Sequence, residues 1–258
     1  MKRYNLGQSR KLCPICFIRD PRDQTPMNLT LPNADIFGLL LWLGCWLGYQ
    51  WFAHVHAQSR VSLLSTLRTY RKGWMRNTLE RDNRIADATL VHNLMQSATF
   101  FSSTTLLIMG GLLAFLGASE KSLDLVSSLP FAAKQQTEQL LEIKALVMLL
   151  VFVHAFLRFT WSVRQFNVVC IFVGSFSNDE NRMKDPAALD MAERAGNLAG
   201  FAGEHFTQGL RSYYFALPVM LWFINPLLFV LASVVITSVV YFMEFHSSTV
   251  AALVPGKK

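Results

Sequence analysis

Long apolar runs are the feature that most restricts what this chain can fold into. The first occupies residues 36–53, and its eighteen uncharged residues make about 27 Å of helix, just enough to cross a hydrocarbon core of roughly 30 Å. Further runs occupy residues 94–116, 143–163 and 213–242. The sequence therefore predicts an all-α membrane helical bundle of about four transmembrane helices, within a domain over residues 27–246.

The composition agrees with this fold class. The chain is 52% hydrophobic and 16% charged, whereas a soluble domain of this length usually carries about 25% charged residues. The net charge of +7 would also suit a protein that binds nucleic acid. The basic residues, however, lie beside the apolar runs, where membrane topology and lipid contact explain them. We therefore expect membrane lipids as partners and do not expect nucleic acid.

Two helical patterns are longer than a bilayer. The last apolar run, residues 213–242, would make about 45 Å of straight helix, and Asn225–Pro226 near its middle is a natural kink. We predict one long kinked span there and keep two half-spans as the alternative. The third pattern continues from Leu140 to about Phe176, so one of its ends must project from the membrane or tilt.

Between the first two runs, residues 55–91 are polar and helical in character. Apolar residues recur every three to four positions and leave basic residues for the wet or headgroup side, which indicates an amphipathic cytoplasmic helix on the membrane surface or beneath the bundle. Asp185–Pro186 is a good pair for the start of another helix. The apolar stripe consists of Leu64, Leu67, Tyr70 and Trp74, and the basic face of Arg68, Arg71, Lys72 and Arg76.

The basic residues are distributed unevenly between the loops. Loops 54–93 and 164–212 carry most of them, and from the end of the second run to the start of the third only Lys121, Lys134 and Lys144 appear. The positive-inside rule therefore predicts that these two loops are cytoplasmic and that both termini lie outside.

Polar tails flank the membrane domain. Residues 1–26 carry basic residues that oppose the predicted orientation, and the conflict disappears if translation begins at Met27. Cys13 and Cys16 in this tail form a CxxC pair, but a structural zinc site needs a second pair of ligands, so no metal site is predicted. A short polar tail, residues 247–258, follows the domain.

Two polar clusters border the predicted spans at the cytoplasmic end. Ionisable groups at the edge of a bilayer are costly, so they indicate either structural pairing or a path for an ion, a lipid headgroup or a substrate. We expect Asp82 or Asp87 to pair with Arg158, and keep as the alternative that Arg158 snorkels to the interface. The first cluster consists of Asp82, Asn83, Arg84 and Asp87, and the second of Arg158, Arg164 and Gln165.

Small residues favour close helix packing at two places. Ser103, Gly110 and Gly111 lie on the second run, and Gly196 and Gly200 lie on the helix that starts at residue 185. We predict that both groups pack against neighbouring helices.

No catalytic or cofactor motif is evident in the sequence. GxSxG, P-loop and HExxH motifs are absent. No cofactor is predicted, but five histidines on the cytoplasmic side leave a b-type haem as an alternative, although no signature fixes the two axial ligands that it needs. These histidines are His54, His56, His92, His154 and His205.

One stretch of the chain carries a family resemblance. Residues 71–117 read RKGWMRNTLERDNRIADATLVHNLMQSATFFSSTTLLIMGGLLAFLG and resemble the bacterial members of the DUF599 family of membrane proteins. The pieces GYQWFA, RFTWSVRQFN and RSYYFALPVMLWFINP fit the same family, and the resemblance covers roughly residues 35–245. It implies a multi-pass protein of the bacterial cytoplasmic (inner) membrane. No catalytic residue carries over, because the function of the family is unknown.

Two function classes remain open. We expect a non-catalytic membrane component, either a homo-oligomer or an accessory subunit of a larger membrane complex, because of the small-residue faces and the basic amphipathic segment. The alternative is a small transporter or channel whose polar path passes Asp82, Arg84 and Arg158. No positive feature supports an enzyme.

Overall fold

In the computed structural model, the described residues form helices and no strand, which confirms the predicted fold class. The structure describes residues 32–56, 63–118, 137–177, 179, 185–246 and 248–253. Four helices, α1, α3, α5 and α8, are long and apolar enough to cross a membrane. The helices are α1 (Asn33–His56), α2 (Leu63–Leu79), α3 (Ile85–Gly117), α5 (Glu138–Ser175), α7 (Pro186–Trp222), α8 (Pro226–Phe245) and α9 (Ser248–Leu253).

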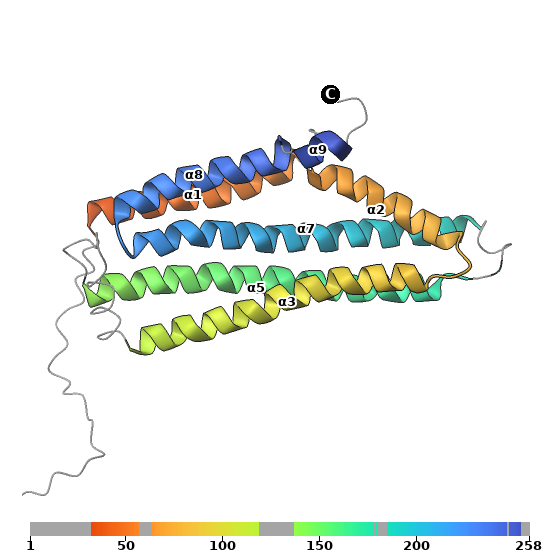
Figure 1. Cartoon of the computed structure of the whole chain (residues 1–258), viewed down its shortest axis with the longest axis horizontal. Coiled ribbons are helices and arrows are strands. Elements are labelled where there is room, and N and C mark those ends of the chain that lie inside the picture. Colours follow the sequence, from red (N-terminus) through yellow and green to blue (C-terminus); the bar gives the residue numbers. More distant parts are fainter. Residues whose placement is uncertain are drawn as a thin grey trace, which may run out of the picture. The chain divides into compact units, whose positions relative to one another are not determined.

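The long helices run side by side (Figure 1). α5 packs against α3 and α7, and α8 packs against α7 and α1. α1 and α8 are parallel, because Gly38 lies against Phe229 and, further along both helices, Tyr49 donates a hydrogen bond to the Val240 carbonyl. The start of α1 and the end of α8 therefore lie at opposite ends of the helix array. This differs from the four-span prediction, in which both ends of the domain lie on one side.

The last apolar run is divided between two antiparallel helices. α7 ends at Trp222 and α8 begins at Pro226, so the prediction of one kinked span over residues 213–242 is wrong. Local chemistry explains the division: the Asn225 side chain accepts a hydrogen bond from a first-turn amide of α8 at 2.8 Å, and the proline occupies a position where the missing N–H has no helical partner to lose. Asp185–Pro186 starts α7 in the same way, as predicted.

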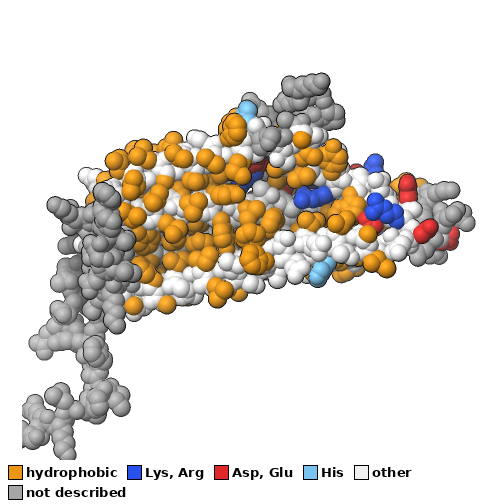
Figure 2. Space-filling view, viewed as in Figure 1, with side chains coloured by type: hydrophobic (Ala, Val, Ile, Leu, Met, Phe, Trp, Pro, Cys, Tyr) orange, Lys and Arg blue, Asp and Glu red, His pale blue; other side chains and the backbone are white. Residues whose placement is uncertain are grey.

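The helix array has two parts, the bundle and the head, whose surfaces differ. Hydrophobic side chains cover most of the visible face of the bundle, and Lys, Arg, Asp and Glu gather toward the end formed by the head (Figure 2). α5 runs through both parts without a break. The first part, the bundle, consists of α1, α8 and residues 99–117, 138–162 and 204–222; the second, the head, consists of α2 and residues 85–98, 163–175 and 186–203.

Each part has its own apolar core. The bundle core contains large aromatic side chains, among them Trp42, Phe215 and Trp222. The head core contains alanines of α7 together with Met75 and Leu79 of α2. Large side chains thus separate the helices of the bundle, whereas small ones bring α2 close to α7.

The packing of α2 on α7 depends on glycine. A Cβ atom at Gly196 would lie 2.8 Å from the Cα of Lys72, and one at Gly200 would lie 3.0 Å from the Arg68 side chain. Arg71 lies against α7 as well, and its burial lowers the pKa of its guanidinium. The predicted wet face of α2 therefore packs in part against α7.

The small residues of α3 have no such neighbour. Ser103, Gly110 and Gly111 are exposed, and a Cβ atom added at either glycine would meet no described atom within 4 Å. Their predicted packing role is not realised inside the described part of this chain, because α3 turns these residues away from α5.

Candidate functional site

The two predicted polar clusters lie apart. Arg158 donates hydrogen bonds to His154 Nε2 at 3.2 Å and to His205 Nδ1 at 3.3 Å. Asp87 has its partners within the head instead, and the two clusters line different pockets. The expected pairing of Asp82 or Asp87 with Arg158 is therefore wrong, and these residues do not form one polar path.

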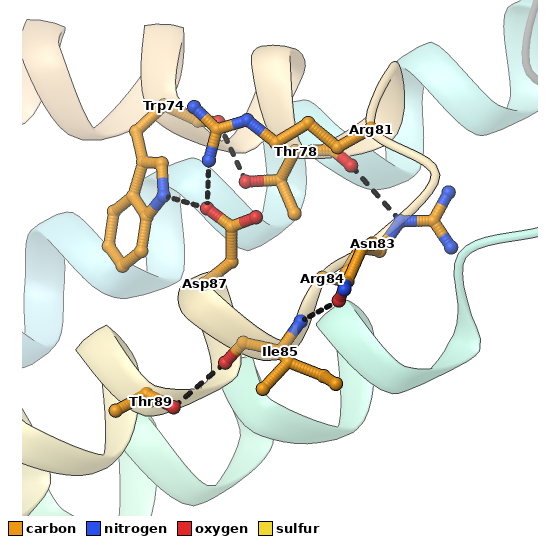
Figure 3. A network of polar contacts seen from close by, with 8 residues as sticks. All are labelled: Trp74, Thr78, Arg81, Asn83, Arg84, Ile85, Asp87 and Thr89. Atoms are coloured by element: carbon orange, nitrogen blue, oxygen red, sulfur yellow. Dashed lines mark hydrogen bonds and ion pairs between the residues drawn. The ribbon is translucent and has the colours of Figure 1, made fainter.

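Asp87 is the centre of a network at the turn between α2 and α3 (Figure 3). Its buried carboxylate accepts hydrogen bonds from Trp74 Nε1 at 2.7 Å and from Arg81 Nη1 at 2.5 Å. Asn83 accepts a hydrogen bond from the Ile85 amide at 3.0 Å, which satisfies one of the free N–H groups at the start of α3. These contacts fix the direction in which the chain enters α3.

Arg84 joins the ends of two helices. Its guanidinium donates to the carbonyl oxygens of Thr78 and Leu79 at the end of α2, at 3.0 and 3.2 Å. It also donates to those of Phe176 and Ser177 after α5, both at 2.8 Å. The last carbonyls of a helix lack helical partners, and a guanidinium carries enough donors to serve several of them. We call this arrangement the Arg84 clamp.

A groove of about 650 Å³ opens beside the Arg84 clamp. It lies between the start of α3 and the end of α5, and its lining includes Asp82, Ile85 and Cys170. Ile85 is 73% exposed, and Ile171 next to Cys170 is 69% exposed. Ile85 thus gives the groove an exposed apolar side chain on the charged part of the molecule, and we take the groove as a candidate interaction surface.

The second pocket, of about 600 Å³, lies in the bundle between α1, α5 and α7. We call it the Arg158 pocket. Because an arginine only donates, the nitrogen that each neighbouring histidine turns to Arg158 must be unprotonated. His154 then carries its proton on Nδ1 and donates to Ser212 Oγ at 2.8 Å, and Ser212 donates to the Gln208 carbonyl at 3.1 Å. Two neutral histidines thus hold the guanidinium in place.

Arg164 and Gln165 do not line the Arg158 pocket. Arg164 is exposed and lies 5.4 Å from the centre of the Trp161 ring, and the buried Oε1 of Gln165 has no hydrogen-bond partner among the described residues. Across all the residues that the structure describes, no group of three or more His, Cys, Asp or Glu residues could hold a metal ion. The haem alternative stays a prediction, and the side chains of His54 and His56 lie outside the described residues.

Comparison with known proteins places this architecture in a family. A family model described as "Protein of unknown function, DUF599" matches residues 37–249, most of the chain. The chain belongs to the DUF599 family. This confirms the resemblance found in the sequence. Neither the curated proteins nor the solved structures contain a match.

In this DUF599 chain, sequence reasoning missed a buried ion pair between α7 and α8. Arg211 is 5% exposed and Glu244 8% exposed, and the two side chains pair with each other. Tyr49 of α1 donates a hydrogen bond to the same carboxylate at 2.9 Å, so three helices meet at this pair. Arg211 and Glu244 are each an isolated charge at one end of the last apolar run, and this isolation was the only sign in the sequence that they pair.

A second buried pair lies at the opposite end of the bundle. Lys144 Nζ lies 4.0 Å from Asp35 Oδ1, and the same oxygen accepts a hydrogen bond from Trp222 Nε1 at 2.5 Å. Lys144 is 1% exposed and Asp35 3% exposed. In the sequence, Asp35 stands immediately before the first run and Lys144 at the start of the third, and nothing in the pattern indicates that the two side chains meet.

Proposed function

We propose that this chain is a non-catalytic component of the bacterial cytoplasmic membrane. The bundle anchors the chain in the membrane, and the head receives a partner subunit. The Arg84 clamp is the observation that carries the proposal. It ties the end of α2 and the end of α5 to the start of α3, and so gives the adjoining groove fixed walls. A surface that is already ordered loses less conformational entropy when a partner binds.

The use of the buried charges supports a structural role. Asp87 is held by Trp74 and Arg81, and the ion pairs of the bundle join separate helices. A catalytic acid or base needs access to a substrate, whereas these groups are engaged with one another.

The packing supports five crossings of the membrane. Residues 204–222 of α7 contribute to the bundle core with α1, α5 and α8, so we infer that this half of α7 crosses with them. Its buried Arg211 is compatible with lipid because Glu244 pairs with it inside the bundle. The basic residues gather in the head, so from the positive-inside rule we infer that the head and the end of α8 lie in the cytoplasm and the start of α1 outside.

The head groove indicates the chemistry of the partner. Ile85 and Val173 in its lining offer aliphatic contact, and Asp82 is exposed and forms no ion pair with another described residue. We infer a partner segment with an apolar side chain that reaches the groove and a basic residue opposite Asp82. Aliphatic anchors in a pocket with a charged rim are a common design of protein interfaces.

The test is recovery of the partner from native membranes in mild detergent. We expect the full-length chain to retain a second protein in constant proportion, and Ile85→Glu to lose it while remaining in the membrane. Leu189→Glu is the matched control, because Leu189 is also exposed on the head, at 49%, but does not line the groove. Equal recovery of the partner with both variants would contradict docking at the groove, and recovery of this chain alone would contradict an accessory role.

A further inference from the structure

The Arg158 pocket contains hydrogen-bonding groups that the fold does not use. A guanidinium has five N–H donors, and the two histidines accept from two of them, which leaves three. Trp46 also lines the pocket, and its buried Nε1–H has no acceptor among the described residues. The Trp46 N–H is a buried donor without an acceptor, which costs free energy, and the half-buried Arg158 adds a positive charge beside it, so the two mark the place of an anionic ligand group.

The same pocket contains acceptors on its other side. Glu204 lines the pocket and carries a negative charge, although it also interacts with another part of the chain. The buried side-chain oxygen of Gln208 has no well-aligned hydrogen-bond donor among the described residues, and its neighbour is the His205 side chain. One ligand that satisfies both sides carries an anion and a hydrogen-bonding cation.

The mouth of the pocket is apolar and lies on the outer surface of the bundle. Leu47 is 59% exposed, Trp51 71% and Phe201 41%. Gly44 and Gly48 continue the same face of α1. They have no side chains there, and a Cβ atom at either would meet no described atom within 4 Å, so this face is open. An apolar strip that leads from a polar pocket fits the acyl chain of a lipid better than a free solute.

We propose that the Arg158 pocket binds the headgroup of a zwitterionic phospholipid, a phosphate diester that carries a primary amine. The phosphate accepts hydrogen bonds from Arg158 and Trp46, which a guanidinium does with high geometric specificity. The ammonium group donates to Glu204 and to the Gln208 oxygen. The acyl chains leave the pocket across Leu47 and the open face of α1 at Gly44 and Gly48. This inference concerns the bundle and does not depend on the partner proposed for the head.

Lipid binding to the purified full-length chain tests the proposal. The chain is delipidated in detergent and titrated with single lipids, and bound copies are counted by native mass spectrometry. We expect phosphatidylethanolamine to bind at least tenfold more tightly than phosphatidylcholine, whose trimethylated amine has no N–H to donate, and than phosphatidylglycerol, which has no amine. Equal affinity for the three lipids would overturn the proposal.

A soluble ligand of the same chemistry is distinguished by free phosphoethanolamine. If the acyl chain contributes, this headgroup alone binds at least a hundredfold more weakly than the lipid. Equal affinity for the free headgroup would overturn the lipid assignment, because the apolar mouth would then contribute nothing.

Variants separate the two halves of the site. Arg158→Gln is expected to weaken binding of all the phospholipids at least tenfold, and Glu204→Gln to remove the preference for phosphatidylethanolamine over phosphatidylglycerol. Arg164→Gln is the matched control, because it removes the same charge from the same helix outside the pocket. An Arg158→Gln chain that binds lipid as the control does would overturn the proposal.

Trp46→Phe tests the phosphate half without disturbing the histidine network. The substitution keeps an aromatic ring beside His154, 5.3 Å away between ring centres, and removes only the N–H that lacks an acceptor. We expect about fivefold weaker binding of phosphatidylethanolamine and unchanged thermal stability without lipid, in keeping with the loss of one hydrogen bond. Unchanged lipid affinity would overturn the assigned contact to the phosphate. This readout remains valid if Arg158→Gln fails to fold.

Discussion

The bundle and the head satisfy their charged groups in different ways. In the bundle, Arg211 and Glu244 are both buried and pair with each other. In the head, Glu193 is 45% exposed in its pairs with Lys72 and Arg76. The hydrocarbon core of a membrane cannot hydrogen-bond a charge, so a charge buried among the bundle helices needs a protein partner, whereas water serves the charges of the head. Loss of one charge should therefore be far more costly in the bundle.

The two parts also differ in how their helices approach one another. Bundle helices are kept apart by interlocking aromatic side chains, for example Trp222 stacked on Phe229 with ring centres 4.8 Å apart. In the head, α2 lies so close to α7 that a Cβ atom at Gly196 would lie only 2.8 Å from the Lys72 Cα. The head therefore depends on the absence of side chains, and the bundle on their presence.

Removal of Arg211 should give the largest effect. Arg211→Met leaves the Glu244 carboxylate buried with Tyr49 as its remaining hydrogen-bond donor, and breaking a buried ion pair costs about 3–5 kcal/mol. The free energy of unfolding in mixed micelles measures this loss. The double variant Arg211→Met/Glu244→Leu should recover most of it, since no uncompensated charge remains. If the double variant is as unstable as the single one, the pair matters through packing and not through charge.

Removal of the Arg84 clamp should come next and should stay within the head. Arg84→Ala frees four carbonyl oxygens at two helix ends, and hydrogen bonds from a charged donor contribute about 1.5–3 kcal/mol each when buried. We expect an overall loss of about 2–3 kcal/mol, because water replaces part of these contacts. Hydrogen exchange should accelerate at the end of α2 and after α5, but not in α1 or α8.

Arg76→Ala is the control for the clamp. Arg76 is also a head arginine near the end of α2, but its side chain is 59% exposed. Its removal should leave the exchange of both helix ends unchanged. An Arg84→Ala chain that exchanges faster in the bundle as well would show that the two parts unfold together.

The two groups of small residues provide the third comparison. Gly196→Ala would force the backbones of α2 and α7 apart, and overpacking of this kind costs about 1–3 kcal/mol. Gly110→Ala points into open space on α3 and should cause no loss, because alanine is the better helix former. Thermal unfolding of both variants measures the difference. A loss of assembled protein with Gly110→Ala would show instead that α3 packs on a second copy of the chain.

The sequence was sufficient for the all-helical class and for the apolar helices, because an uncharged apolar run of bilayer length is typical of a membrane-spanning helix. It failed at Asn225–Pro226, where the local signal for a new helix was the same as at Asp185–Pro186. The second signal stood in a polar loop and was interpreted correctly. The first stood inside a continuous apolar run, and hydropathy alone does not distinguish a kinked helix from a hairpin of two.

The candidate sites were harder to predict, because the sequence gives no distances between helices. Arg158 was singled out as an unusual charge, but the three helices that line its pocket bring Trp46 and Gln208 to it from opposite halves of the chain. Arg84 was singled out for its charge, whereas its partners are backbone carbonyls. Backbone groups look alike in every sequence, so no pattern could have named them.

The exposed pairs of the head should give the smallest effect. Glu193 lies 3.7 Å from Lys72 Nζ and 3.6 Å from Arg76 Nη2, and exposed ion pairs contribute about 0–1 kcal/mol. Glu193→Gln should therefore change the free energy of unfolding by less than about 0.5 kcal/mol, and salt should reduce that difference further because it screens exposed charges. The loss with Arg211→Met should not change with salt, since that pair is shielded from the solvent. Unfolding titrations of both variants at low and high salt make the comparison. A salt-dependent loss with Arg211→Met would mean that water reaches the bundle pair, and the contrast between bundle and head would then be one of degree.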